Sequence, residues 1–500
     1  MRTSLEGTRF DLLIIGGGIT GAGVARDAAL RGLSVALVEK DDFGSGTSSR
    51  SSRLVHGGIR YLEYAQIGMV RESVREREIL LKIAPHLVHP LEFTWPVYRK
   101  ARVSRTKLRL GIGLYNILAG HPSVPRIHSM SGVLEREPKL RQTGLRGGAT
   151  YTDAATDDAR LTLANILSAR AAGAVVVNHA EALRPVSRAK GYWVVRVADA
   201  ALGAEFEVKA NTVVNATGPW RLNLERRWPQ HRLQRRGSKG AHIALRQEKV
   251  GNKGALTIIS PDDGRVMFIL PAGKFTIVGT TDTWIDDPPD EARANEADVA
   301  YLLRAVEAYF PETELTEEDV VSAWAGIRPL AESDTTKNPS HLSREHKIAK
   351  TGAGMIVVTG GKLTTYRSMA AEIVDCVEKE LGKKPSKCVT DDRELPGAER
   401  EGHLQKLIAS DATLGARLHE ALPYTLAELR YGVSNEMALT LSDLLMRRTR
   451  FAFDTPDHGL SSVSRISESV ATFAGWDNYQ KKAQLEAYSD EVARVFAVDP

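Results

Sequence analysis

Short apolar runs alternate with glycine-rich turns and helical segments at the start of the chain. Residues 10–15 form an apolar run rich in branched side chains, and residues 34–38 form a second one. Between them, residues 22–31 are mostly small and end at a glycine. Apolar runs of this length predict buried parallel strands, and the segment between them predicts a helix. The pattern therefore indicates a β-α-β unit.

The turn between the first strand and this helix has the spacing of a dinucleotide-binding loop. Residues 16–21 read Gly-Gly-Gly-Ile-Thr-Gly and fit G-x-G-x-x-G. Gly16 permits the tight turn, Gly18 lets the backbone approach a pyrophosphate, and Gly21 lets helix and strand pack closely. Glu39 follows the second strand, where a carboxylate accepts hydrogen bonds from a ribose and disfavours the phosphate of NADP. The unit does not separate NAD from FAD, because both share this phosphate chemistry.

A second strand, glycine turn and helix occur much later in the chain. Residues 355–359 predict a strand, residues 360–365 read Gly-Gly-Lys-Leu-Thr-Thr, and residues 369–379 are helical in pattern. A helix N-terminus pointed at a flavin C2 carbonyl stabilises the negative charge that reduction places there, and a lysine adds a cation. The alternative is a corner whose glycines serve only close packing. The expected cofactor contacts here are Gly361, Lys362, Leu363 and Thr364.

A third segment also ends a predicted strand with a small-residue turn. Residues 213–218 read Val-Val-Asn-Ala-Thr-Gly. On the residues alone this is a strand turn of any kind, but it resembles the strand beside the dinucleotide in flavoproteins with two dinucleotide folds. We therefore expect Thr217 and Gly218 to contact the cofactor.

Length and composition limit the class of protein. A chain of 500 residues exceeds what one hydrophobic core usually organises, so two or three structural units are expected. The formal net charge of +5, from 67 basic and 62 acidic residues, is too small to indicate nucleic-acid binding. It is compatible with an anionic substrate or an acidic membrane surface, and equally with an ordinary solvated surface.

Cysteine usage and hydropathy point to a cytoplasmic protein. Cys376 and Cys388 are the only cysteines, which excludes a disulfide framework and any four-cysteine zinc or iron–sulfur site. No metal is expected. The segment before Phe10 leaves no room for the apolar region of a signal peptide, and no apolar run reaches the length of a membrane span. We therefore expect any membrane contact to be peripheral.

Long stretches of the chain closely resemble FAD-dependent glycerol-3-phosphate dehydrogenases. Residues 44–49 read Gly-Ser-Gly-Thr-Ser-Ser, and residues 51–63 read Ser-Ser-Arg-Leu-Val-His-Gly-Gly-Ile-Arg-Tyr-Leu-Glu. The resemblance continues, over roughly the first three quarters of the chain, through residues 157–161, 215–220, 239–242, 279–282, 326–330 and 360–367. The C-terminal quarter resembles the helical domain of this family more loosely.

The resemblance implies an α/β fold, α+β overall, with three kinds of unit. These are an FAD-binding Rossmann-like domain of the two-dinucleotide type, an antiparallel-sheet substrate domain and a C-terminal helical domain. The FAD domain must be discontinuous, because its glycine turns lie near residues 16 and 362. The expected limits are residues 9–90, 150–235 and 325–385 for FAD, 91–149 and 236–324 for the substrate, and 390–500 for the helices.

The activity implied by the resemblance is the FAD-dependent oxidation of sn-glycerol 3-phosphate to dihydroxyacetone phosphate. Hydride would pass from C2 to the flavin, and the electrons would pass to a membrane quinone at the cytoplasmic face of the inner membrane. A glycerol-3-phosphate oxidase that uses oxygen is one alternative, disfavoured because such relatives tend to carry an internal insertion that this chain lacks. Two further alternatives are a flavin amine or amino-acid oxidase and a flavin-bearing binding or regulatory protein without turnover. A homodimer is left open.

The resemblance also assigns site residues. Arg60 and Arg328 are expected to bind the substrate phosphate, because one guanidinium binds two phosphate oxygens. Lys362 would reach substrate or flavin, and Thr281 would place a hydroxyl near the substrate. His242 is the preferred base.

Further family-matched groups each have two possible roles. His56 is the second candidate base, and it could instead orient the cofactor. Thr47 and Ser48 are expected to donate to flavin or pyrophosphate, although serines and threonines in such a loop are also ordinary capping residues. No Gly-x-Ser-x-Gly elbow lies between a predicted strand and helix, so a hydrolase fits poorly.

Residues 105–118 combine a basic start with large apolar side chains. Such a segment predicts an amphipathic helix in the membrane interface, with Lys107 and Arg109 near anionic lipid, and it would bring the flavin close to quinone. The alternative is an amphipathic helix that packs on the protein core.

Overall fold

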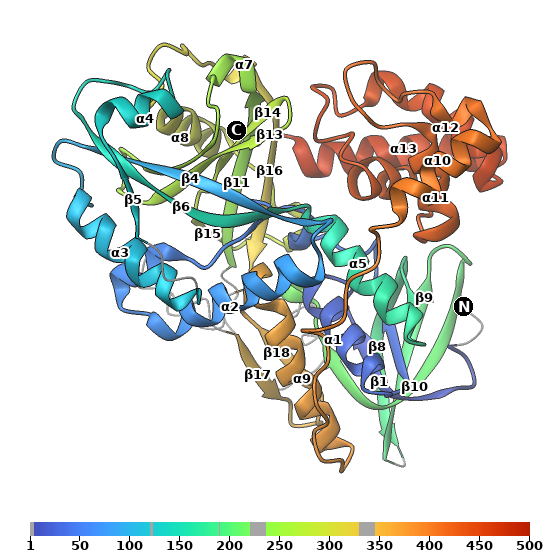
Figure 1. Cartoon of the computed structure of the whole chain (residues 1–500). Helices are drawn as coiled ribbons and strands as arrows, with labels where there is room; N and C mark the ends of the chain where they lie inside the picture. Colours follow the sequence, from blue (N-terminus) through green and yellow to red (C-terminus); the bar gives the residue numbers. More distant parts are fainter. Residues whose placement is uncertain (1–4, 121–123, 190, 221–236, 330–345) are drawn as a thin grey trace.

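A computed structural model of the chain describes residues 5–120, 124–189, 191–220, 237–329 and 346–500. Leu330, the last residue of the matched segment 326–330, lies outside them. Figure 1 shows one sheet with flanking helices in the lower part, a second sheet at the upper left and a group of helices at the upper right.

The first sheet is built around the N-terminal strand. Its order is β17-β18-β10-β1-β2-β7, and β8 and β9 pair off this path. β1 runs parallel to β10 and β2, β2 to β7, and β10 to β18, whereas β17 and β9 are antiparallel to their neighbours. The strands are β1 (Arg9–Ile15), β2 (Val35–Val38), β7 (Val175–Val177), β8 (Ala180–Ala189), β9 (Tyr192–Asp199), β10 (Ala204–Asn215), β17 (Lys347–Lys350) and β18 (Ile356–Thr359). Neighbouring strands are far apart in sequence, so the unit is discontinuous.

Three helices flank this parallel region. They are α1 (Ile19–Leu30), α5 (Asp158–Ala171) and α9 (Tyr366–Glu380), and α1 contacts both of the others. Their small and branched side chains, among them Val24, Ile166 and Ile373, share a core with Ile14 and Leu37 of the sheet. The predicted β-α-β unit and the predicted second strand–turn–helix are confirmed.

The second sheet is almost entirely antiparallel. Its order is β15-β11-β14-β13-β12-β4-β6-β3, with β16 on β11 and β5 on β6. Only β4 and β12 pair in parallel among the described strand pairs of this sheet. The strands are β3 (Leu54–Val55), β4 (Val88–Tyr98), β5 (Arg126–His128), β6 (Leu145–Thr156), β11 (Gly237–Arg246), β12 (Ala255–Ile259), β13 (Val266–Ala272), β14 (Phe275–Gly279), β15 (Thr283–Ile285) and β16 (Val320–Arg328).

Helices cover this sheet as well. α4 (Met130–Arg136) and α8 (Glu296–Glu307) share one core with it, and α2 (Ile67–Ile83) and α3 (Arg105–Leu118) share another. The expected mixed fold with an antiparallel sheet is therefore confirmed.

The two sheets divide the chain at points that differ from the expected domain limits. β3, the start of β4, the end of β6 and the end of β16 belong to the second sheet, although they fall within the ranges expected for the FAD domain. The physical reason is that Val55 of β3, Val88 of β4 and Ala154 of β6 share one core with Leu161 of α5 and Tyr366 of α9, so this end of the second sheet packs on the FAD unit.

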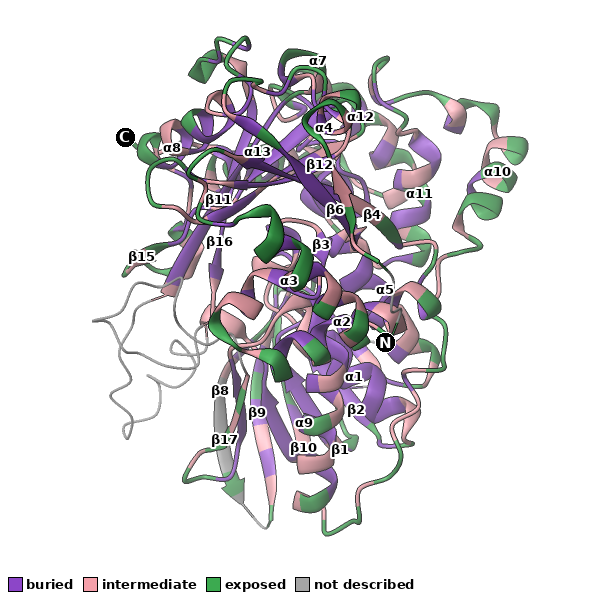
Figure 2. Ribbon diagram, turned by 60° about the vertical axis from the view of Figure 1, so that its left-hand side comes forward, coloured by how far each residue is buried: buried purple, intermediate pink, exposed green. Residues whose placement is uncertain are grey.

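The C-terminal quarter is helical, as expected. It contains α10 (Arg400–Ser410), α11 (Leu426–Asn435), a π-helical segment η10 (Asp443–Arg448), α12 (Leu460–Ala474) and α13 (Asn478–Phe496). Buried residues of this quarter, such as Leu444 and Phe453, continue the core that includes Phe93 and Trp324 of the second sheet. Figure 2 shows buried positions running through the strands and exposed positions on the outer side of α3.

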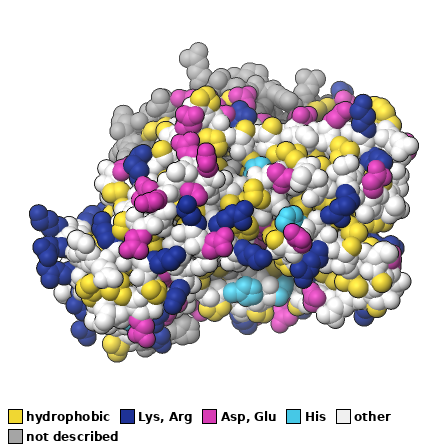
Figure 3. Space-filling view, turned by 90° about the horizontal axis from the view of Figure 1, so that it is seen from above, with side chains coloured by type: hydrophobic (Ala, Val, Ile, Leu, Met, Phe, Trp, Pro, Cys, Tyr) yellow, Lys and Arg dark blue, Asp and Glu magenta, His cyan; other side chains and the backbone are white. Residues whose placement is uncertain are grey.

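The surface offers no large field of one sign on the face seen in Figure 3, where basic and acidic side chains are intermixed. Within the described residues, no helix combines the length and apolar character that crossing a membrane requires.

Candidate active site

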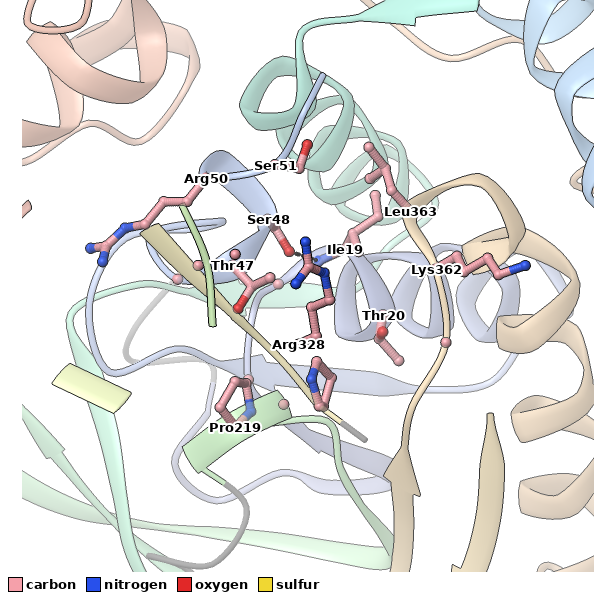
Figure 4. A pocket seen from close by; sticks show the side chains of 18 of the residues that line it. Ile19, Thr20, Thr47, Ser48, Arg50, Ser51, Pro219, Arg328, Lys362 and Leu363 are labelled. Atoms are coloured by element: carbon pink, nitrogen blue, oxygen red, sulfur yellow. Dashed lines mark hydrogen bonds between the residues drawn. The ribbon is translucent and has the colours of Figure 1, made fainter. Parts of the chain in front are cut away.

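A cavity of about 500 Å³ lies at the junction of the two sheets. The first sheet contributes the turn after β1, the residues after β2 and β10, and the turn after β18; the second contributes parts of β11, β13 and β16. The carboxyl ends of parallel strands are where open α/β sheets bind ligands. Figure 4 shows side chains from these segments around the cavity.

The glycine turn leaves no room for side chains. A Cβ atom on Gly21 would lie 1.9 Å from the Gly16 carbonyl oxygen, and one on Gly16 would lie 2.7 Å from that of Ala216. Gly16 also has a φ of +106°, which glycine adopts at little cost. Gly18, whose Cβ would lie 3.2 Å from Ser48 Oγ, lines the cavity at the start of α1. The turn therefore presents bare backbone to the cavity.

Glu39 is fixed at the edge of the cavity by backbone groups. Gly17 N–H donates to its Oε2 at 2.6 Å, and Asp41 N–H donates to its Oε1 at 3.0 Å. Burial raises the pKa of Glu39 to about 7, although these two donors oppose the shift. A carboxylate held in this way has oxygens placed to accept further hydrogen bonds from a ribose.

Thr47 and Ser48, two predicted cofactor contacts in the loop after β2, already have hydrogen-bond partners for their hydroxyl groups. Ser48 Oγ accepts a hydrogen bond from Ile19 N–H at 2.9 Å, so it caps the first turn of α1. Thr47 Oγ1 donates to the carbonyl oxygen of Ile327 at 2.6 Å, which ties the loop to β16. Both residues line the cavity, and in Figure 4 Ser48 lies beside Ile19.

Thr217 and Gly218 also line the cavity, at the end of β10. The Thr217 hydroxyl donates to Asn215 Oδ1 at 2.7 Å. The placement agrees with the expectation, while contact with a cofactor stays a prediction.

The second glycine turn brings a lysine to the opposite part of the cavity. Gly361 has a φ of +98°, and its Cβ would lie 2.4 Å from the Met369 sulfur of α9. The Lys362 ammonium lies 4.3 Å from the centre of the Tyr61 ring. The Thr364 hydroxyl accepts a hydrogen bond from His56 N–H at 3.0 Å and donates one to the His56 carbonyl oxygen at 3.2 Å. This turn and the segment around His56 are thus joined, and Leu363 lines the cavity with them.

His242 lies in the middle of β11 and is enclosed on several sides. Its Nε2 is 2.8 Å from Ser52 Oγ, and its ring stacks on Trp324 with centroids 5.6 Å apart. A Cβ on Gly279 would lie 2.2 Å from its Cδ2. Burial lowers the pKa of His242 to about 3, and the charges of Arg328 and Arg53 contribute to the decrease. The imidazole is therefore neutral near pH 7.

His56 has similar electrostatics but a different neighbourhood. Burial lowers its pKa to about 4, Asp153 opposes the shift, and Lys362 and Arg60 strengthen it. Its ring lies 6.2 Å from that of Phe268. Both candidate bases thus line the cavity in the neutral form, so electrostatics alone does not choose between them.

The two predicted phosphate-binding arginines both line the cavity. Arg328 Nη1 pairs with Asp282 Oδ1 at 3.2 Å, and its Nη2 donates to Thr280 Oγ1 at 2.9 Å. Its guanidinium lies over Gly240, where a Cβ would be 2.3 Å from Nη2. Arg60 donates to the Tyr61 hydroxyl at 3.2 Å. These contacts fix planar donor groups against the cavity wall.

Thr281 does not reach the cavity wall. Its side chain is buried, and its Oγ1 accepts a hydrogen bond from Ala241 N–H at 2.9 Å. The neighbouring Thr280 lines the cavity instead. The sequence could not separate the two threonines, because the turn after β14 decides which side chain faces inward.

Ser52 and Tyr61 are cavity residues that the sequence interpretation did not assign. Both lie within the family-like segment 51–63, yet serine and tyrosine there have no spacing that marks a role. The contact of Ser52 with His242, which joins positions 190 residues apart, places its hydroxyl beside the candidate base.

Family models match most of the chain. The model described as FAD dependent oxidoreductase matches residues 11–367. The model described as the C-terminal domain of alpha-glycerophosphate oxidase matches residues 403–481.

Relatives named as glycerol-3-phosphate dehydrogenases match nearly the whole length. The aerobic glycerol-3-phosphate dehydrogenase of Staphylococcus saprophyticus is 34% identical over 98% of this chain and 95% of its own. Glycerol-3-phosphate dehydrogenase 2 of Mycobacterium tuberculosis is 38% identical over 96% of this chain and 89% of its own.

Solved structures agree with these relatives. The glycerol-3-phosphate dehydrogenase of Bacillus halodurans, complexed with FAD, has a TM-score of 0.78 and 30% identity, with 98% of this chain and 96% of that chain covered. A glycine oxidase from Geobacillus kaustophilus has a TM-score of 0.57 and 20% identity, and covers 78% of this chain and 98% of its own. That likeness concerns the fold alone.

The cavity fits FAD, the cofactor of this family. The bare backbone at Gly16–Gly21 suits a pyrophosphate, Glu39 suits a ribose, and the turn at Gly361–Thr364 suits the flavin ring. These features lie on one cavity, in the segments where the sequence pattern had placed them. With the full-length matches, they establish that this chain belongs to the family of FAD-dependent glycerol-3-phosphate dehydrogenases.

Proposed function

We propose that this protein oxidises sn-glycerol 3-phosphate to dihydroxyacetone phosphate with FAD as its cofactor. The observation that carries the proposal is the position of Arg328 and Arg60 on the wall of the same cavity as the glycine turns. Relatives that match the chain through its C-terminal helices bear the name of this activity. The glycine oxidase, whose match leaves part of the chain uncovered, supports the amino-acid oxidase alternative less well.

Arg328 and Arg60 are proposed to bind the phosphate group. A guanidinium binds two oxygens of a phosphate in one plane, and the contacts with Asp282 and Tyr61 fix the planes before substrate arrives. Lys362 adds positive charge on the side of the second glycine turn. The carbon chain of the substrate would then lie between the arginines and the flavin.

FAD, when bound, supplies the acceptor for the hydride that leaves C2. The chain must take the proton of the C2 hydroxyl, and His242 is proposed as the base because it lines the cavity in the neutral form and its ring is held by Trp324. Its lowered pKa alone would make it a weak base, so the proposal rests on its position. Its Nε2 contacts Ser52, so Ser52 would orient the ring or lie between it and the hydroxyl. His56 remains the second candidate, and its backbone contacts with Thr364 suit an orienting role.

A membrane quinone is proposed as the electron acceptor, reached from the surface through α3. This helix packs on the core by Leu108, Ile112 and Tyr115. Its opposite face exposes Leu110 and Ile117, with 71% and 62% of their surface accessible. The two sequence interpretations are therefore compatible, since one face is packed and the other is free to enter the interface of an anionic bilayer. Such binding would hold the protein at the membrane surface, and we propose the cytoplasmic face, as the sequence predicts.

Oxygen is the alternative acceptor. The C-terminal family model bears the name of an alpha-glycerophosphate oxidase. The two acceptors differ in a simple measurement, because an oxidase consumes oxygen as substrate is oxidised without added quinone.

Replacing Arg328 tests the phosphate assignment. We expect Arg328→Ala to lower kcat/KM for sn-glycerol 3-phosphate by about 100-fold or more with FAD still bound, because two charge-assisted hydrogen bonds are lost. Arg328→Lys should recover little, since a point charge lacks the planar geometry. Dye-linked steady-state kinetics measure both. Arg246→Ala, an exposed arginine at the far end of β11, is the matched control. Unchanged kinetics of Arg328→Ala would refute the phosphate role.

The charge state of the histidines can be observed directly. Their folded pKa values of about 3 and about 4 predict that the ring resonances of His242 and His56 do not titrate between about pH 5.5 and pH 8. Unfolded histidines take up protons near pH 6.5, so both sites should lower the free energy of unfolding as pH falls below that value. NMR of protein with labelled histidine, assigned with His242→Gln and His56→Gln, measures the titration. A midpoint near the ordinary value would contradict this electrostatic description.

The membrane role of α3 is tested with two acidic substitutions. We expect Leu110→Glu with Ile117→Glu to weaken binding to anionic vesicles by about tenfold or more, because two apolar side chains can no longer enter the interface. Activity with a soluble dye should not change. Tyr479→Glu, at an exposed aromatic on α13, is the matched control in vesicle sedimentation. Equal vesicle binding by both variants would remove α3 from the membrane surface.

A further inference from the structure

The segment between β2 and β3, residues 39–53, forms much of the cofactor cavity and is called the cofactor loop below. Most of its residues line the cavity. Its only described regular element is one 3-10 turn, Thr47–Ser49. A loop of this kind is held in one shape mainly by contacts with its surroundings, because it has few backbone hydrogen bonds of its own.

The first external contact is a buried ionic cluster at Asp42. Arg448 binds both carboxylate oxygens of Asp42, at 2.7 and 2.9 Å, and Arg447 Nε donates to the same group at 2.7 Å. Burial alone would raise the pKa of Asp42, but the two arginines hold it below its ordinary value. Both arginines belong to η10, so the C-terminal helical unit binds the cofactor loop directly.

The second contact passes through Asp158 at the start of α5. Its Oδ2 accepts from Ser51 N–H at 3.0 Å and from Ser51 Oγ at 2.7 Å. Its Oδ1 accepts from Arg450 Nη1 at 3.2 Å. One carboxylate therefore joins the C-terminal unit to the residue beside Ser52, which contacts His242.

The third contact is aromatic. The Arg53 guanidinium lies 5.5 Å from the centres of the Trp324 and Phe453 rings. Phe453 belongs to the C-terminal unit and meets Trp324 edge to face, with centroids 5.3 Å apart. Trp324 stacks in turn on His242. All three contacts thus run from residues 447–453 to the cofactor loop or its neighbours, and Figure 1 shows the C-terminal helices beside α5.

A metal site does not explain this cluster. Asp42, His179 and Asp443 place possible ligand atoms within 4.8 Å of one another. However, the Asp42 carboxylate is bound by two guanidinium groups, and the oxygens of Asp443 accept from Arg447, Thr440 and the Leu439 backbone. The arginines already supply the positive charge that a metal ion would bring, and their N–H groups already occupy the carboxylate oxygens that would have to bind it.

We propose that the C-terminal helical unit is a cofactor-retention unit: Arg447, Arg448 and Arg450 hold the cofactor loop in the shape that binds FAD, and so set the affinity for FAD from outside the cavity. These arginines are positioning residues, since they act through Asp42 and Asp158 and do not line the cavity. If only a fraction of the apoprotein has the binding-competent loop, the apparent Kd rises by the inverse of that fraction. The inference concerns the cofactor and does not depend on which substrate is oxidised.

The test measures FAD binding by the full-length apoprotein. We expect Arg448→Met and Arg450→Met each to raise the Kd for FAD by about tenfold or more and to speed FAD release, followed by the recovery of FAD fluorescence. Arg465→Met is the matched control, because Arg465 binds the Leu418 carbonyl oxygen within the same helical unit. Its Kd should stay within about twofold of wild type. At saturating FAD, the flavin of Arg448→Met and of Arg450→Met should still be reduced by sn-glycerol 3-phosphate.

A double variant separates loop positioning from general stability. In Arg448→Met the buried Asp42 carboxylate keeps Arg447 but loses the two hydrogen bonds of Arg448. Adding Asp42→Asn removes this under-compensated charge while Arg447 still pairs with Asp443, so thermal stability should largely recover. The weak FAD affinity should remain, because residue 448 still makes no hydrogen bond to the cofactor loop. Recovery of both properties, or a wild-type Kd in Arg448→Met, would overturn the proposal.

Hydrogen exchange tests the same coupling in the unmodified protein, should the variants not fold. Binding free energies are reciprocal, so FAD must stabilise the arginine segment if that segment stabilises FAD binding. We expect FAD to slow amide exchange in residues 443–453 as well as in the cofactor loop. Protection of the loop without protection of residues 443–453 would contradict the proposal.

Discussion

The contact between Gly21 and the Gly16 carbonyl determines where the cofactor cavity lies. No side chain fits between the first turn of α1 and the end of β1, so the helix begins against the strand and its N-terminus opens toward the carboxyl edge of the sheet. Glu39 and the end of β10 border the same edge because β2 and β10 are the neighbours of β1. The remaining groups of the site are brought to this edge by the second sheet and by the turn after β18.

Burial of its histidines and nearby cations determine the electrostatics of the second half of the cavity. His242 and His56 are neutral because burial and nearby cations oppose their protonation. The same burial strengthens the ion pair of Arg328 with Asp282. It also strengthens the attraction between these cations and an anionic substrate. A neutral histidine and fixed cations on one cavity wall suit the proposed removal of hydride from a phosphorylated alcohol.

Local patterns predicted the parts of the fold that depend on neighbouring residues. The glycine turns, the strands around them and Glu39 follow from spacing and periodicity, and the resemblance added Arg60, Arg328 and the two histidines, all of which line the cavity. The choice of Thr280 over Thr281 depends on the direction of one turn. The contact of Asp42 with Arg448 joins positions 406 residues apart, for which a single sequence has no periodic signal. Such long-range pairs position the site, and only the three-dimensional structure reveals them.

The proposed activity is tested most directly by the visible spectrum of the purified protein under nitrogen, before and after addition of sn-glycerol 3-phosphate. We expect a yellow flavoprotein whose absorbance bleaches when this substrate is added, since electrons enter the flavin and no acceptor removes them. A yellow protein that this substrate leaves unchanged, and that an amino acid bleaches instead, would contradict the assigned substrate while leaving the FAD fold intact.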